Sequence, residues 1–408
     1  MSDTIAAVST GTQVCAIGIV RMSGGKAIEI ADRLFSPVSG RKMADCEDRK
    51  LIYGKLCDEQ GRLLDICLCT ISRAPNSYTG EDTAEFQCHG SPVVLRAVLE
   101  AAFSLGARQA LPGEFTKRAF LNGRMDLSGA EAVADIIDAE TAEAARNAAG
   151  QLGGAISRRI DEIYGTLTDI SSHYHAVLDY PDEDIEDFTL ARYESDIERC
   201  TAVLESLRAS YDSGKLLHSG VPAAIVGRPN AGKSSLLNAV LGYDRAIVTD
   251  IPGTTRDTIE EKLRLGGVLL RLTDTAGIRE TDDEIERMGV TRSRRAMEQA
   301  ELVLAVIDGH REITCEDLEL IKCAERAPHG IVILSKHDLG SLSKMPETTL
   351  PVIEISSVTG EGLDKLEDTV RALFPMPVAP AGEILTNARQ FDAVSRALES
   401  MKAAGGAM

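Results

Sequence analysis

Residues 227–234, GRPNAGKS, have the composition and spacing of a loop that binds nucleotide phosphates. The glycines at both ends allow backbone N–H groups to point at phosphate oxygens, and the helix expected to begin near Lys233 adds its positive end. In such a loop the Lys233 ammonium reaches the β- and γ-phosphates, and the Ser234 hydroxyl binds Mg²⁺. A lone match of this kind can also be a glycine-rich turn between a strand and a helix. The other motifs decide between this turn and a phosphate-binding loop.

Four further motifs follow, each at the end of a predicted strand. A loop at 253–255 can place the Thr255 hydroxyl on the same Mg²⁺. In the Asp-x-x-Gly motif at 274–277, Asp274 falls where a second shell of Mg²⁺ ligands is needed, and the N–H of Gly277 falls where the γ-phosphate is sensed. The order of these motifs after the phosphate loop predicts a nucleotide switch domain.

Two late motifs indicate that the nucleotide is guanine. Residues 335–338, SKHD, follow an apolar run, and the Asp338 carboxylate can accept hydrogen bonds from N1–H and the exocyclic amine of guanine. Adenine does not offer this pair of donors in that arrangement, and the Lys336 stem is expected to lie along the base. The run 352–355 then leads into Ser356, Ser357 and Val358, which complete the base-binding set. The five motifs together predict a GTPase domain.

Water activation in this domain must differ from that of small signalling GTPases. Those proteins carry a glutamine directly after Asp-x-x-Gly, whereas this chain has Ile278, which cannot form a hydrogen bond through its side chain. A carboxylate of the acidic run that follows is the natural candidate, although most of that run is expected to be a solvated loop; its members are Glu280, Asp282, Asp283, Glu284 and Glu286. No arginine finger is evident, and Asn230 is a candidate for holding a monovalent cation instead.

Composition indicates a cytosolic globular protein of two or three domains. The chain has 408 residues, of which 44% are apolar and 26% charged. No apolar run approaches the roughly 20 residues that span a bilayer, and the first residues lack the features of a signal peptide. The net charge of −19 argues against broad, nonspecific binding of nucleic acid, so any RNA contact is expected to be local. The nine scattered cysteines are expected to be reduced thiols, and Cys67 and Cys69 to lie in the core rather than in a metal site.

The pattern of residues predicts a multidomain α/β protein. Residues 1–125 alternate strand-like and helical runs, which predicts an α+β domain. Residues 126–218 form long helices and belong to an all-α domain that resumes at 379–408, where a returning helix is expected. The nucleotide motifs lie in residues 219–378, which predict a Ras-like α/β domain with a mostly parallel sheet, inserted into the helical one.

Outside the nucleotide motifs, three long segments carry a specific resemblance. They are residues 18–24 (GIVRMSG), 76–82 (NSYTGED) and 112–127 (PGEFTKRAFLNGRMDL). Over essentially its whole length the chain resembles the MnmE (TrmE) family of tRNA-modification GTPases. The resemblance implies an N-terminal domain that binds tetrahydrofolate and dimerises, a helical domain, and a GTPase domain inserted into the helical one. It also implies a cytoplasmic homodimer with no membrane association, which forms a heterotetramer with the FAD protein MnmG and installs an aminomethyl or carboxymethylaminomethyl group on C5 of the tRNA wobble uridine (U34).

Residue roles follow from the resemblance position by position. Arg21, Glu85 and Arg124 fall where the family binds 5-formyl- or 5,10-methylene-tetrahydrofolate; surface or ion-pair residues are the alternative. Ser234 and Thr255 match the Mg²⁺ ligands, and Glu286 matches the residue that positions the attacking water, with Lys233 as the other catalytic group. The K⁺ ligands correspond to Asn230, Thr249, Ile251 and Thr254. The GTP-contacting positions are Asn230, Ala231, Gly232, Lys233, Ser234, Ser235, Thr249, Asp250, Ile251, Pro252, Gly253, Thr254, Thr255, Asp274, Thr275, Ala276, Gly277, Ser335, Lys336, His337, Asp338, Ser356, Ser357 and Val358.

The chain departs from the family pattern at three places. Ser335 replaces the usual Asn, so a hydrogen bond to the base and bracing of the phosphate loop are expected to weaken. Ser357 replaces Ala, a mild change because the contact uses a backbone N–H. The chain ends at Met408, whereas the family pattern continues to Cys-Ile-Gly-Lys; this predicts weaker folate binding and uncovered helical faces. Two alternatives remain: a GTP-dependent assembly or binding module without modification activity, and a ribosome-assembly GTPase, which does not explain residues 1–125.

Overall fold

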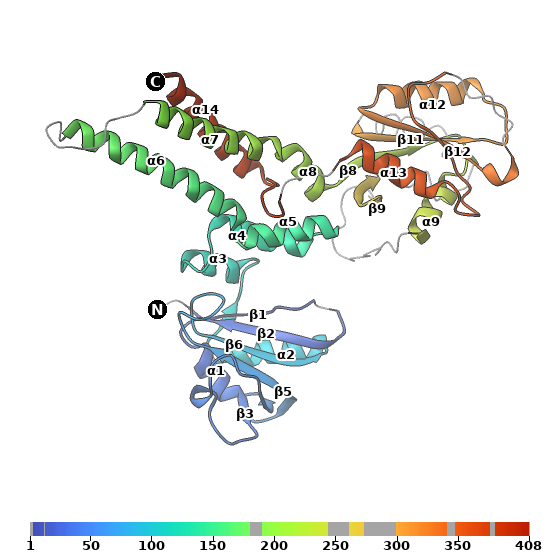
Figure 1. The fold of residues 1–408 in the computed structure, drawn as a ribbon. Helices are drawn as coiled ribbons and strands as arrows, with labels where there is room; N and C mark the ends of the chain where they lie inside the picture. Colours follow the sequence, from blue (N-terminus) through green and yellow to red (C-terminus); the bar gives the residue numbers. More distant parts are fainter. Residues whose placement is uncertain are drawn as a thin grey trace. The chain divides into compact units, whose positions relative to one another are not determined.

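The computed structural model describes residues 3–11, 13–179, 190–243, 261–272, 299–340, 347–375 and 380–407. The chain divides into two compact units, Met1–Ala134 (unit 1) and Asp135–Met408 (unit 2). Figure 1 shows a sheet in each unit and a set of long helices in unit 2. Among the residues that the structure describes, no helix is both long and apolar enough to cross a membrane.

Unit 1 is built on a seven-stranded sheet within its described residues, with strand order β3-β4-β5-β6-β2-β1-β7. Neighbouring strands are antiparallel except β1 and β7, which are parallel. The strands are β1 (Ile5–Val8), β2 (Cys15–Ser23), β3 (Phe35–Pro37), β4 (Ile52–Cys57), β5 (Leu63–Ser72), β6 (Thr83–Gly90) and β7 (Arg108–Gln109).

One face of this sheet is covered by α1 (Ala27–Leu34) and α2 (Pro92–Ser104). Alternate residues of each strand point to the same face, and the inward set packs with the apolar faces of these helices in one core. The other face carries apolar side chains that stay exposed, among them Ile17 and Tyr53. A short 3-10 helix (Met43–Asp45) and α3 (Glu114–Leu121) complete the unit, before α4 (Leu127–Asp138).

The helical part of unit 2 is assembled from segments far apart in the chain. It consists of α5 (Ala142–Leu152), α6 (Ala155–Asp179), α7 (Leu190–Ala209), α8 (Tyr211–Ser219) and α14 (Ala388–Ala407). Helix α14 packs against α7 in a shared apolar core (Figure 1). The segment before α14 docks on α5 and α8: Ile384 accepts a hydrogen bond from Gln151 at 2.6 Å, and a Cβ at Gly214 would lie 2.0 Å from the Leu385 carbonyl oxygen. Only glycine allows that approach.

The second sheet has six strands among the described residues, in the order β13-β12-β11-β8-β10-β9. All pairs are parallel except β9 with β10. Helices α9 and α13 pack on one face, and α12 packs on the other. The elements are β8 (Val221–Val226), α9 (Lys233–Tyr243), β9 (Glu261–Leu265), β10 (Val268–Leu272), β11 (Leu302–Asp308), α12 (Cys315–Arg326), β12 (His329–Ser335), a 3-10 helix (His337–Leu339), β13 (Val352–Glu354) and α13 (Leu363–Leu373).

The predicted fold classes are confirmed: an α+β amino-terminal part, a helical part and a mostly parallel α/β sheet. The parallel strands of the second sheet are apolar along almost their whole length, as expected when helices cover both faces. Because these strands are parallel, the loops that follow β8, β11, β12 and β13 all leave the sheet at the same edge. Open α/β sheets bind ligands at this edge.

Candidate functional site

The phosphate loop lies between β8 and α9. A Cβ at Gly227 would lie 2.4 Å from the Val306 carbonyl oxygen, so glycine alone lets the loop leave the strand beside β11. Asn230 has a φ of 62° and Gly232 a φ of 97°, both in the left-handed region. This backbone turns the chain back on itself just before α9 begins at Lys233, so the helix starts with its positive end at the loop.

The Lys233 side chain lies across the loop. Its Nζ donates to the carbonyl oxygens of Gly227 at 2.7 Å and Arg228 at 2.9 Å. Burial lowers the pKa of Lys233, because desolvation disfavours the ammonium. Carbonyl oxygens hold this buried charge in place, and a phosphate oxygen in the loop would be a stronger partner because it carries negative charge.

Ser335, which stands where the family pattern has Asn, contacts the phosphate loop. It is buried at the end of β12, and its Oγ donates to the Ala231 carbonyl oxygen at 2.6 Å. The Ile307 carbonyl oxygen lies 3.1 Å from the same hydroxyl. The shorter side chain therefore still ties the base-side strand to the loop, although it leaves no amide group for the base.

The other base-side residues meet at the same edge of the sheet. Lys336, at a φ of 61°, donates from Nζ to Asp308 Oδ2 at 2.6 Å. Asp338 Oδ1 accepts a hydrogen bond from the buried Ser356 Oγ at 2.8 Å, which fixes the orientation of the carboxylate. The His337 backbone N–H donates to the Ile355 carbonyl oxygen at 3.2 Å. The structure thus brings the 335–338 and 356–358 motifs together.

Asp308 is a member of this set that the motifs did not predict. Although its burial acts in the opposite direction, hydrogen bonds from Lys336 and the His310 N–H lower its pKa, so it stays ionised. Its place as the last residue of an apolar strand, at the carboxyl edge of the sheet, was the only signal in the sequence. Asp308 orients the Lys336 side chain through this ion pair.

The remaining predicted positions divide into two groups. Ser234 and Ser235 lie in the first turn of α9, Ser357 is half-buried after β13, and Val358 is exposed. The others lie outside the described residues: Thr249, Asp250, Ile251, Pro252, Gly253, Thr254, Thr255, Asp274, Thr275, Ala276, Gly277 and Glu286.

A second constellation lies in unit 1, on the sheet face away from α1 and α2. Arg21 on β2 stands opposite Glu85 on β6, and Arg21 Nε donates to Glu85 Oε1 at 2.6 Å. Both side chains remain about a quarter exposed. The Arg21 guanidinium lies 5.4 Å from the ring centre of Tyr78 and 5.7 Å from that of Phe115. A flat cation, a carboxylate and two aromatic rings therefore share one accessible place.

Arg124 contacts the same loop as Tyr78. Its Nε donates to the Ser77 carbonyl oxygen at 3.1 Å. Arg118 fixes the position of residues 76–82. Its guanidinium donates to the Glu81 carboxylate at 2.9 Å and to the Asp3 carboxylate at 2.7 Å. Ser23 Oγ donates to the same Glu81 carboxylate at 2.7 Å. This network was not predicted; its only signal was the charged pair Glu114 and Arg118 in the 112–127 segment.

We expect Glu114 to contribute to the loss of stability in acid. Hydrogen bonds from Arg108 outweigh the opposing effect of burial and lower the pKa of Glu114 to about 2. A carboxyl with a lowered folded-state pKa stabilises the fold fully above its unfolded pKa, and this contribution is lost as pH falls through the folded value. Glu114→Gln should therefore be less stable than wild type at pH 7, and the difference should shrink between about pH 4.5 and pH 2.

Urea denaturation followed by circular dichroism at several pH values measures this difference. Glu47→Gln, at an exposed carboxylate, is the control and should differ little from wild type at any pH. A gap between wild type and Glu114→Gln that stays constant down to pH 2 would contradict the assignment.

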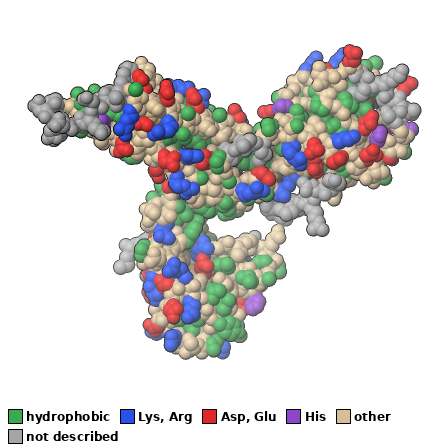
Figure 2. Space-filling model, in the orientation of Figure 1, with side chains coloured by type: hydrophobic (Ala, Val, Ile, Leu, Met, Phe, Trp, Pro, Cys, Tyr) green, Lys and Arg blue, Asp and Glu red, His purple; other side chains and the backbone are tan. Residues whose placement is uncertain are grey.

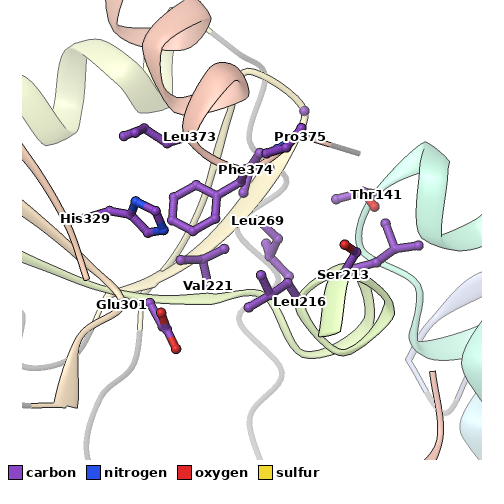
Figure 3. A pocket seen from close by; sticks show the side chains of 13 residues that line it. Thr141, Ser213, Leu216, Val221, Leu269, Glu301, His329, Leu373, Phe374 and Pro375 are labelled. Atoms are coloured by element: carbon purple, nitrogen blue, oxygen red, sulfur yellow. The ribbon is translucent and has the colours of Figure 1, made fainter. Parts of the chain in front are cut away.

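A cavity of about 190 Å³ in unit 2 lies at the opposite edge of the second sheet (Figure 3). It is lined mainly by apolar side chains, including Val221 at the start of β8 and Leu269 on β10. The Phe374 ring packs edge-on against His329 at the start of β12, with ring centres 4.8 Å apart. Because it borders the amino ends of these strands, this cavity is separate from the nucleotide motifs.

Two family models match the chain. The family model "GTP-binding protein TrmE N-terminus" matches residues 4–124, and the model "MnmE helical domain" matches residues 127–408. The G domain of the FeoB iron transporter of T. maritima is 27% identical over 38% of this chain and 98% of its own, with a TM-score of 0.28.

Curated relatives extend the match along the chain. A tRNA modification GTPase MnmE of Clostridioides difficile (strain 630) is 41% identical and covers 98% of this chain and 88% of its own length. One of Roseiflexus sp. (strain RS-1) is 43% identical over 97% of this chain and 88% of its own length. On these matches the chain belongs to the MnmE family of tRNA modification GTPases.

Proposed function

We propose that this chain hydrolyses GTP and takes part in modification of C5 of the wobble uridine of tRNA. The observation that carries the proposal is the convergence of Lys233, Asp338 and Ser356 at the carboxyl edge of one parallel sheet, where α/β folds bind nucleotides. Residues 219–378 form the GTPase domain in this proposal. Residues 1–125 bind folate, and residues 126–218 with 379–408 form the helical domain.

Each described residue has a distinct task in hydrolysis. Lys233 neutralises charge that develops on the γ-phosphate, and the backbone N–H groups of the loop bind the other phosphate oxygens. Asp338, oriented by Ser356, accepts the guanine N1–H and amine, while Lys336 is held along the base by Asp308. The hydrogen bond from Ser335 to Ala231 holds the phosphate loop against the end of β12.

The residues present also fit the two cations. Ser234 in the first turn of α9 offers a hydroxyl oxygen, the hard type of ligand that Mg²⁺ prefers, and Thr255 would be the second such ligand. Asn230, turned at a positive φ in the loop, would hold K⁺ with Thr249, Ile251 and Thr254. A cation there supplies the positive charge that an arginine finger supplies in other GTPases.

We expect hydrolysis to be faster in K⁺ than in Na⁺ at equal ionic strength, and to depend on Glu286. Ile278 cannot orient the attacking water, so Glu286→Ala should lower turnover by roughly 10²–10⁴-fold with nucleotide affinity nearly unchanged. Phosphate release under saturating GTP measures turnover, and displacement of a fluorescent GDP measures affinity. Glu280→Ala is the control and should have a smaller effect; normal turnover of Glu286→Ala would assign the role to another group.

The second constellation supports a folate site. Folates combine a flat pterin, which carries an amino group, with a carboxylate tail. Glu85 would bind the amino-bearing edge, the rings of Tyr78 and Phe115 would stack on the pterin, and Arg21 or Arg124 would pair with carboxylates. When bound, 5-formyl- or 5,10-methylene-tetrahydrofolate supplies the one-carbon unit. The Arg118 network keeps the 76–82 loop in the shape that this site needs.

We expect Arg21→Lys to weaken the binding of 5-formyl-tetrahydrofolate by about 10-fold or more. Lysine keeps the charge but loses the planar fork and the stacking on Tyr78 and Phe115, and a charged hydrogen bond is worth about 1.5–3 kcal/mol. Calorimetric titration measures the affinity. Arg33→Lys, at an exposed arginine of α1, is the control. GTP turnover should stay normal in both variants, and unchanged folate affinity in Arg21→Lys would exclude the assignment.

Dimerisation and the partner protein complete the proposal. The outward face of the unit 1 sheet carries exposed Ile17, Tyr53 and Ile66 on β2, β4 and β5. Hydrophobic side chains gather on the surface formed by this unit (Figure 2), as at a face that pairs with a second copy. We assign MnmG as the FAD partner. Measuring tRNA modification with MnmG separately from GTP hydrolysis and folate binding distinguishes this function from that of an assembly GTPase.

A further inference from the structure

A cluster of potential metal ligands lies in unit 1, apart from the folate and nucleotide constellations. The carboxylate of Asp65 and the thiols of Cys67 and Cys88 have ligand atoms that all lie within 4.8 Å of one another. All nine cysteines are free, and within the described part of the chain this is the one group of three or more such ligands. Neither the proposed GTPase reaction nor the folate site uses it.

The register of the sheet creates this cluster. On the antiparallel strands β5 and β6 the last registered pair is Leu68 with Gln87, so one step further Cys67 stands opposite Cys88. Side chains directly opposite each other have Cβ atoms about 4.5–5.5 Å apart. Asp65 lies two residues before Cys67 and so points to the same face. Three ligands therefore converge from a two-stranded ladder, without any contribution from a loop.

The environment of the cluster suits a bound cation that solvent can reach. Cys67 is 5% exposed and Cys88 is 2% exposed, and both belong to the core beneath the sheet. The Asp65 side chain is 10% exposed, while that of His89 is 77% exposed. The two thiols thus form the inner side of the cluster, and the carboxylate and the imidazole form its opening to water.

His89 orients the Asp65 carboxylate. Its backbone N–H donates to Asp65 Oδ2 at 2.8 Å, and its ring Nδ1 lies 2.8 Å from Oδ1. Partners of this kind fix a ligand in place and strengthen metal binding. The hydrogen bond from the His89 N–H accounts for a carboxylate at position 65. It does not account for the two thiols that face each other beside it.

We propose that Asp65, Cys67 and Cys88 bind one thiophilic divalent cation of the zinc class, with His89 orienting the carboxylate and water completing the coordination. Zinc bonds to sulfur at about 2.3 Å and to oxygen at about 2.0–2.2 Å in tetrahedral sites, which places ligand atoms roughly 3–4 Å apart. The separations here require only a small contraction. Thiolate, carboxylate and water are also the ligand types of known zinc sites.

A disulfide between Cys67 and Cys88 is the main alternative use of the pair. Both thiols are free in the structure, and a disulfide would use only the two sulfur atoms. A divalent cation bonds to both thiolates and to the Asp65 carboxylate, so it uses all three ligand atoms that the strands bring together. The observations therefore favour the cation.

Titration of the reduced, chelator-treated 408-residue chain with Co²⁺ and then Zn²⁺ tests the proposal. We expect one equivalent of Co²⁺ to give a thiolate-to-cobalt charge-transfer band, and one equivalent of Zn²⁺ to remove it. Cys67→Ser and Cys88→Ser should each lose the band, and Asp65→Asn should weaken Zn²⁺ binding while both thiols remain. His89→Gln should weaken it less, by the roughly 10–100-fold typical of a residue that orients a ligand.

Cys69→Ser is the matched control, because Cys69 lies on the same strand and face and is fully buried but is not part of the cluster. Thermal unfolding separates metal binding from general damage to the core: Zn²⁺ should raise the melting temperature of wild type and Cys69→Ser, but not that of Cys88→Ser. If the serine variants do not fold, Asp65→Asn and the wild-type titration decide the question.

Three results would each overturn the proposal. One is the absence of stoichiometric binding to the reduced wild-type chain. Another is a charge-transfer band that persists in both Cys67→Ser and Cys88→Ser, which would place the ion on other cysteines. The third is a reduced chain that binds no metal but yields a Cys67–Cys88 disulfide in air, identified by mass spectrometry of peptides, which would make the pair a redox device.

Discussion

Lys233→Ala should lower the turnover of GTP by about 10²–10³-fold, the loss typical when one preorganised donor to developing charge is removed. The Lys233 ammonium already lies across the phosphate loop, at 2.7 Å and 2.9 Å from the Gly227 and Arg228 carbonyl oxygens. Few rearrangements are therefore needed when phosphate replaces one of these partners. Single-turnover hydrolysis under saturating GTP isolates the chemical step from nucleotide binding.

Two controls make the Lys233 result specific. Lys322→Ala removes an exposed lysine from α12 and should leave turnover unchanged. Circular dichroism should show the same helix content for Lys233→Ala and wild type, because the hydrogen bonds of this side chain to described residues reach only the loop that precedes its own helix. Near-normal hydrolysis by Lys233→Ala would mean that the loop does not bind the γ-phosphate.

Asp338→Ala should remove the preference for guanine. Asp338 is expected to accept two hydrogen bonds from the base, and charged hydrogen bonds are worth about 1.5–3 kcal/mol each, so GTP affinity should fall by roughly 10²-fold or more. The affinity for ATP, which does not use this carboxylate, should change little. Competition between GTP and ATP for a fluorescent nucleotide measures both affinities in one experiment.

Ser356→Ala tests how much of the guanine affinity depends on the orientation of the Asp338 carboxylate rather than on its presence. Its hydroxyl donates to Asp338 Oδ1 at 2.8 Å and accepts a hydrogen bond from the Thr359 N–H at 3.2 Å, and we expect its effect on the base to pass through the carboxylate. GTP affinity should therefore fall less than in Asp338→Ala, and guanine should remain preferred. Equal affinity of the wild-type protein for GTP and ATP would contradict the guanine assignment altogether.

The sequence predicted those parts of the site that are formed by short, contiguous segments of the chain. The phosphate loop joins a strand to a helix within a dozen residues, and the structure has β8 end at Val226 and α9 begin at Lys233. Apolar runs likewise predicted β12 before Ser335 and β13 before Ser356. These signals survive because strand and helix periodicity and glycine placement are properties of short segments.

Contacts between distant segments could not be predicted in this way. The bond of Ser335 to Ala231 joins residues about 100 positions apart, and that of Arg118 to Asp3 joins residues about 115 apart. Each of these bonds depends on the register of the sheet and on whether the side chain is long enough to reach its partner. A local sequence pattern specifies neither the register nor the reach. The pairing of Cys67 with Cys88 was missed for the same reason: only Cys67 and Cys69 are close in sequence.

The divided helical part has a consequence for synthesis of the chain on the ribosome. Helix α14 supplies Leu398 and Met401 to a core that also contains Leu204 of α7, yet roughly 180 residues separate the two helices. At about 5–20 residues per second, α7 waits on the order of ten to forty seconds for its partner, while the second sheet emerges and folds. During this interval α7 has α6 beside it but lacks α14, so the apolar side chains that α14 later covers stay exposed, and we expect holdase chaperones to engage them during translation.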